Sequence, residues 1–149
     1  SGTENTAAIV GFGKAIEEIQ NPRTHLMNIK IRQLRDKMIK EILRRIPKAV
    51  ISGSMRQRLP NNIHVRVEGV FGKDLAMMLD QKGVAVSTGS ACSEKTEDPS
   101  HVLLAMGIDS KNALSSIRMA LGKYTTLQEI LKSMKVLETC IDELRRRKI

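Results

Sequence analysis

Apolar residues recur at helical spacing in the early and late parts of the chain. Across residues 23–46 they form one stripe, and three more residues widen it: Met27, Ile31, Leu34, Met38 and Ile42, with Ile39, Leu43 and Ile46. A second stripe crosses residues 126–147 at Leu127, Ile130, Met134, Leu137, Ile141 and Leu144. These patterns predict two long amphipathic helices. A third helix is expected over 3–19, capped near Thr3 and stopped by Asn21-Pro22.

Elsewhere apolar and polar residues alternate with the period of a strand that buries one face. In residues 63–67 the apolar residues are Ile63, Val65 and Val67, which leaves His64 on the polar face. Residues 116–121 alternate in the same way, so Arg118 points away from the apolar face of its strand. Further strands are expected at 49–51 and 84–86, and short helices at 74–82 and 99–106. The elements predict an α+β fold, with helices packed on a small, mostly antiparallel sheet.

Composition restricts the class of protein. The 149 residues, 41% of them hydrophobic, suit a single domain that builds its core from aliphatic residues and methionine, because aromatic residues are scarce. The net charge is +9, and residues 23–48 hold nine Lys or Arg against Asp36 and Glu41, a local balance of 9 − 2 = +7. A second basic cluster lies at 145–148, and neither cluster contains stacking aromatics, so nucleic acid is not favoured as a partner. A solvated helix face is favoured, and an acidic protein partner remains possible.

No secretory leader and no apolar run near about 18 residues stands in the sequence, so we expect a cytoplasmic protein without a membrane segment. The two cysteines, Cys92 and Cys140, form no metal-like cluster with histidine, so we expect both to be reduced and no metal to be bound. Cys140 lies beside the last apolar stripe and is expected in the core.

Cys92 has a different setting. The short apolar run 84–86 leads into small residues that end at Cys92, and the polar stretch 93–99 follows. This pattern predicts a mobile loop over 88–98 that exposes the thiol. Taken by itself, one loop cysteine without an identified base is more often incidental than catalytic.

Four motifs change that estimate. Ser-Thr-Gly-Ser-Ala-Cys at 87–92, Pro-Ser-His-Val-Leu at 99–103, Ser-Ser-Ile-Arg at 115–118 and Leu-Gly-Lys-Tyr-Thr-Thr at 121–126 occur in this order. Together they resemble the C-terminal part of the pyridoxal-phosphate-dependent cysteine desulfurases, in the class V aminotransferase family. The long polar loop is similar to that of the iron-sulfur-assembly and nitrogen-fixation branch. The resemblance covers essentially the whole chain.

The resemblance implies a fold and a set of roles. The fold would be the C-terminal domain of a fold-type I pyridoxal phosphate enzyme. Cys92 would be the catalytic nucleophile that takes sulfur from L-cysteine as a persulfide, and Arg118 would bind the substrate carboxylate. Thr3 would reach the cofactor phosphate of the partner subunit in a homodimer. Considered without the family, Arg118 is a surface ion-pair residue and Thr3 a helix cap.

The same resemblance implies that this chain is a fragment. The family's cofactor-binding lysine, stacking histidine and pyridine-facing aspartate belong to a larger N-terminal domain, which residues 1–22 would adjoin, while 23–149 would form the small domain. Alone, the chain is expected to bind no pyridoxal phosphate and to be inactive. The complete protein would pass sulfur to an iron-sulfur scaffold or another acceptor protein. Two alternatives stay open: a stand-alone module that binds an acidic sulfur-carrier or scaffold protein, and a selenocysteine lyase.

Overall fold

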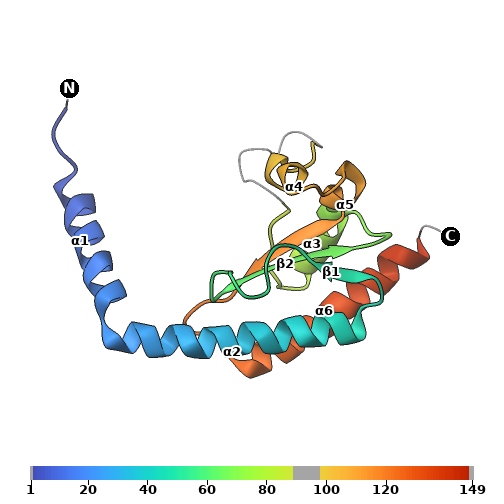
Figure 1. Ribbon diagram of the computed structural model, residues 1–149, viewed down its shortest axis with the longest axis horizontal. Helices are drawn as coiled ribbons and strands as arrows, with labels where there is room; N and C mark the ends of the chain where they lie inside the picture. The colour runs from blue at the N-terminus through green and yellow to red at the C-terminus, as the bar shows by residue number, and fades with distance from the viewer. Residues whose placement is uncertain (1, 89–97, 148–149) are drawn as a thin grey trace.

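The computed structural model of the chain describes residues 2–88 and 98–147. Three strands form an antiparallel sheet with β2 in the centre: β1 (Ala49–Ile51), β2 (Asn62–Val67) and β3 (Ser116–Ala120). The helices are α1 (Thr6–Gln20), α2 (Pro22–Arg45), α3 (Gly72–Gln81), α4 (His101–Ala105), α5 (Ser110–Leu114) and α6 (Leu127–Arg146). In Figure 1, α2 and α6 lie on one side of the sheet and α4 and α5 on the other. The predicted α+β fold is confirmed.

The long helices begin where the sequence offers caps. The side chain of Asn21 accepts a hydrogen bond from the Arg23 N–H at 2.9 Å, and Pro22 occupies the first turn of α2, where its missing N–H costs nothing. Thr126 and Glu129 cap α6 reciprocally, since each side chain accepts from the other residue's backbone N–H. These caps fix the two helices that carry most of the apolar stripe residues.

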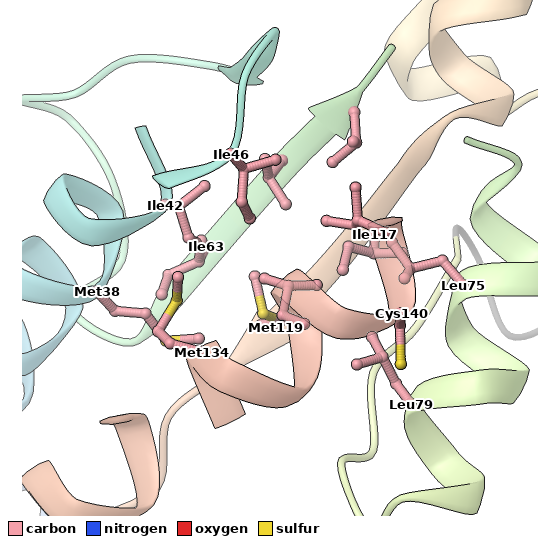
Figure 2. Close-up of a cluster of buried hydrophobic side chains, with 14 of the residues drawn as sticks. Met38, Ile42, Ile46, Ile63, Leu75, Leu79, Ile117, Met119, Met134 and Cys140 are labelled. Atoms are coloured by element: carbon pink, nitrogen blue, oxygen red, sulfur yellow. The ribbon is translucent and has the colours of Figure 1, made fainter. Parts of the chain in front are cut away.

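The core lies between one face of the sheet and α2, α3 and α6 (Figure 2). Ile63, Val65 and Val67 of β2 are fully buried there. Cys140 of α6 is also fully buried, as its position beside the stripe predicted, and points into the cluster that contains Leu79 (Figure 2). Two residues assigned to the stripes are more exposed than expected, namely Leu43 at 49% and Leu127 at 37%, because each stripe is wider than the surface its helix buries.

One glycine sets the distance between α3 and β3. A Cβ atom at Gly72 would lie 2.5 Å from the backbone oxygen of Ser116 and 3.0 Å from that of Leu114. Only a residue without a side chain permits this approach. The start of α3 is therefore held against β3, the strand that carries Arg118.

The middle of the chain differs from the prediction in two places, since one predicted strand is absent from the described residues and one helix was not predicted. Residues 84–86 do not form a strand, because the Val84 N–H bonds the Leu79 oxygen at 2.9 Å, and within the described residues the chain after α3 pairs with β3 at Ser87 alone. Helix α5 was not predicted, since its five residues are too short to show a period. It begins at an Asp109 cap, whose carboxylate accepts from the Asn112 N–H at 2.9 Å.

Helix α1 differs from the others because none of its residues is buried. It starts at Thr6 with Asn5 as its cap, so the expected capping role of Thr3 is wrong. Figure 1 shows α1 extending away from the sheet, with the N-terminus at its far end. Large apolar side chains on it are exposed to solvent: Ile9, Val10, Phe12, Ile16 and Ile19.

Candidate functional site

Four residues form a row across the face of the sheet that is turned away from the core. The Ser52 N–H donates to the His64 oxygen at 2.9 Å, and His64 stands directly opposite Arg118 in the antiparallel register. Arg118 and Ser87 exchange both backbone hydrogen bonds, at 2.6 and 3.0 Å. Ser52, His64, Arg118 and Ser87 are called the cross-sheet row below. The prediction that Arg118 points away from the apolar face is confirmed by its exposure within a buried strand.

A cavity of about 430 Å³ opens over this row. Its polar wall comes from the sheet and from the loop that joins β1 to β2, and its apolar wall comes from α4. The lining residues are Ser52, Gly53, Ser54, Gln57, Arg58, Leu59, Asn62, His64, Ser100, Val102, Leu103, Met106 and Arg118. Three members of the cross-sheet row thus face one cavity, which joins cationic and apolar surface.

Two arginines hold the loop that forms one wall of the cavity. Arg58 donates to the backbone oxygens of Ser52, Ser54 and Asn62, the Ser54 bond measuring 3.0 Å. Arg35 of α2 is 4% exposed, donates to the Leu59 oxygen at 2.8 Å and pairs with Asp36 at 2.6 Å. Burial, followed by the nearby charge of Arg35, lowers the pKa of Arg58. Because the guanidinium of Arg58 donates its hydrogen bonds to backbone carbonyls, we interpret Arg58 as a residue that stabilises this wall of the cavity.

His64 lies in a strongly cationic setting. Burial is the first cause that lowers its pKa, and the positive charges of Arg118, Arg58 and Arg66 lower it further. The imidazole is therefore neutral near neutral pH. Its buried Nδ1 atom and the buried Ser52 hydroxyl oxygen have no hydrogen-bond partner within the described part of the chain.

This arrangement suits a small carboxylate. A guanidinium presents parallel N–H donors that match the two oxygens of a carboxylate, and Arg118 presents such a group at the cavity. The donor set does not suit pyridoxal phosphate, because neither a lysine for the Schiff base nor an acidic partner for the pyridine nitrogen lines the described cavity. The cavity thus presents a donor group that could bind a carboxylate, without the groups that pyridoxal phosphate needs.

Among residues 2–88 and 98–147, no three His, Cys, Asp or Glu side chains are grouped so that they could hold a metal ion. None of the helices in these two ranges is both long and apolar enough to span a membrane.

The structure does not bring together all the residues that sequence reasoning selected. Cys92 and most of the predicted loop 88–98 lie outside the described residues. Ser87 is bonded to Arg118 on one side of this gap, and Ser100 lines the cavity on the other. Thr3 is exposed ahead of α1, on the segment that extends away from the sheet (Figure 1). Of the two that the structure describes, Arg118 lines the cavity and Thr3 does not.

The site also holds residues that sequence reasoning did not select. His64 was placed on a polar strand face, but only the pairing of β2 with β3 makes it the neighbour of Arg118. Arg58 follows no periodic pattern and acts through backbone carbonyls far from any motif. Strand alternation was the one signal that pointed toward His64.

An antiparallel sheet backed by long helices, with an arginine and a histidine bordering a cavity on its open face, defines an α+β domain. The family model for class-V aminotransferases matches residues 1–132. The chain belongs to the class-V aminotransferase family.

Its relatives agree with that assignment. Over 149 aligned positions the chain is 42% identical to a cysteine desulfurase IscS of Dictyoglomus turgidum, with 97% of this chain and 36% of the relative covered. A cysteine desulfurase IscS of Archaeoglobus fulgidus is 40% identical over 145 residues, covering 97% of this chain and 37% of the relative. A solved NifS-like protein from Rickettsia africae superimposes with a TM-score of 0.80 at 30% identity, over 95% of this chain and 36% of that one. The chain therefore spans little more than a third of the length of these relatives.

Proposed function

We propose that this chain is the C-terminal part of a cysteine desulfurase, which converts L-cysteine to L-alanine and captures the sulfur on Cys92 as a persulfide. The observation that carries this proposal is the pairing of Arg118 with Ser87, which ties the carboxylate-binding arginine to the chain that leads to Cys92. The relatives named above as cysteine desulfurases support it.

The chemistry assigns one task to each residue. Arg118 holds the substrate carboxylate, which fixes the amino acid in the cavity. The Cys92 thiolate attacks the substrate sulfur, a sulfur–sulfur bond forms, and the carbon–sulfur bond breaks. The electron pair of the broken bond remains with the substrate carbon, which takes a proton to give alanine. Pyridoxal phosphate, held by the rest of the protein, supplies the electron sink for this cleavage.

The chain from Ser87 to Cys92 is long enough for the thiol to reach a substrate held by Arg118. Cys92 lies five positions after Ser87, and five extended residues span at most roughly 18 Å. The attachment point of that tether is bonded to Arg118 itself. The thiol can therefore meet a substrate held by Arg118, and the same tether lets it present sulfur to an iron-sulfur scaffold or another acceptor.

Helix α1 supports the division into two domains. Its exposed apolar side chains need a partner surface, and the relatives extend well beyond the length matched here. We infer that residues 1–22 pack against the remainder of the protein. Thr3 would then reach the cofactor phosphate of the partner subunit in a homodimer.

The test uses the full-length protein with Cys92→Ser and, as the matched control, Cys140→Ala. Cys92→Ser should abolish persulfide and alanine formation, because it removes the nucleophile. Cys140→Ala should retain both, because burial raises the pKa of Cys140 and keeps its thiol away from substrate. Mass spectrometry after turnover locates the persulfide, and an alanine assay measures turnover.

Alanine and sulfide production that survives Cys92→Ser but is lost with Cys140→Ala would refute the assignment. Turnover of L-selenocysteine, with none of L-cysteine, would support the lyase alternative.

A further inference from the structure

The backbone bonding brings the side chains of His64 and Arg118 close together. Arg118 directs both its N–H and its carbonyl toward Ser87, and the His64 carbonyl is directed toward Ser52. His64 and Arg118 therefore form a non-hydrogen-bonded pair of the antiparallel ladder. In such pairs the two Cα atoms approach to about 4.5 Å and the side chains are at their closest.

The protonation state of His64 suits it to accept from a guanidinium. Three cations face it: Arg118 from β3, Arg66 from its own strand and Arg58 from the loop between β1 and β2. Together with burial they lower the pKa of His64 and keep it neutral. A neutral imidazole has one nitrogen that accepts a hydrogen bond, whereas a protonated one has none.

Both partners also have hydrogen-bonding capacity to spare. The guanidinium of Arg118 has five N–H donors, and its one described side-chain bond, from Nη2 to the Ser87 hydroxyl oxygen, is long at 3.4 Å. The buried Nδ1 of His64 is without a partner in the described part of the chain. Arg58, the other cation at this cavity, already donates to three backbone oxygens.

We propose that His64 is a positioning residue for Arg118: the neutral imidazole accepts a hydrogen bond from the guanidinium and orients its remaining donors toward the carboxylate of the substrate. This inference rests on the proposed function, since it concerns how that substrate is held. It assigns a role in the site to a residue that stands opposite Arg118 in the sheet and need not touch the reacting atoms.

The experiment is a double-mutant cycle in the full-length protein, with L-cysteine as substrate. His64→Leu should raise KM about fivefold and leave kcat within about twofold, because the hydrogen bond that orients the guanidinium is lost while Arg118 itself remains. His64→Asn should recover most of the loss, since its amide oxygen still accepts. In an Arg118→Ala background, His64→Leu should add nothing, because the group that it positions is already gone.

His101→Leu on the exposed surface of α4 is the matched control, and its KM should stay at the wild-type value. The thermal midpoint is measured for every variant, so that a folding defect is distinguished from a change in KM. Additive effects of His64→Leu and Arg118→Ala on KM would overturn the proposal.

A second readout does not depend on turnover. In the same protein labelled with 15N-histidine, the resonances that His64→Leu removes should show one neutral tautomer in the wild type and a mixture in Arg118→Ala. If the proportions of the two neutral His64 tautomers are the same in the wild type and in Arg118→Ala, the proposal is overturned. If the wild type releases no alanine from L-cysteine, the proposed function fails, and this spectrum alone decides the role of His64.

Discussion

The two faces of the sheet are built from the same strands and have opposite character. On one face Ile63, Val65 and Val67 are fully buried against α2, α3 and α6. On the other, His64 of β2 and Arg118 of β3 alternate with the buried residues of their own strands and border the cavity. A strand sends successive side chains to opposite faces, so a single stretch of chain serves both the core and the site.

Substitutions on the two faces of the sheet should therefore affect different properties, stability on the core face and substrate binding on the open face. A residue of the core face contributes through apolar burial, whereas a residue of the open face contributes through charge and hydrogen bonds. Substitutions at neighbouring positions of one strand should then affect different measurements.

The largest effect is expected on the core face. Ile63→Ala should lower the free energy of unfolding by about 2–5 kcal/mol, because it removes a fully buried side chain and leaves a cavity. Urea unfolding of the chain measures this loss. Val50→Ala is the control on the open face, where Val50 is 46% exposed, and should change the value by no more than about 0.5 kcal/mol. Equal losses would contradict the separation of the faces.

The next effect concerns the open face. Arg118→Ala in the full-length protein should raise KM for L-cysteine about tenfold to a hundredfold, because charged hydrogen bonds to a carboxylate contribute about 1.5–3 kcal/mol. The thermal midpoint should change little. Arg56→Ala is the control, since Arg56 is an exposed arginine of the loop between β1 and β2 that does not line the cavity. An unchanged KM together with a large loss of stability would instead make Arg118 a structural residue.

The smallest effect is a dependence on pH that belongs to the open face. The pKa of His64 lies below its ordinary value of 6.5 in the folded chain, mainly because of burial. The unfolded chain therefore binds more protons as pH falls, and stability must decrease from about pH 7 to about pH 5.5. In His64→Asn, the stability of the chain should decrease less over this pH range than in the wild type. Urea unfolding at both pH values measures the change in the free energy of unfolding, and the same change in the wild type and in His64→Asn would rule out this contribution of His64.

Local pattern was enough for much of the fold. The stripes of α2 and α6 and the alternation in β2 and β3 required only the spacing of apolar residues, so those elements were predicted within a few residues. The segment 84–86 was mistaken for a strand because its composition suits one. The segment is not a strand because the Val84 N–H is bonded to a carbonyl near the end of α3. That bond depends on how the chain turns after Lys82.

The sequence by itself determined the helices other than α5, the alternating strands, the aliphatic core with Cys140 inside it, and the motifs that resemble a cysteine desulfurase. Only the tertiary structure decided that His64 stands opposite Arg118, that Ser87 pairs with that same arginine, and that Arg58 holds the cavity wall. The reason is physical. Periodicity records which face of an element is buried, but strand pairing joins residues far apart in the chain, and no local pattern encodes the register between them.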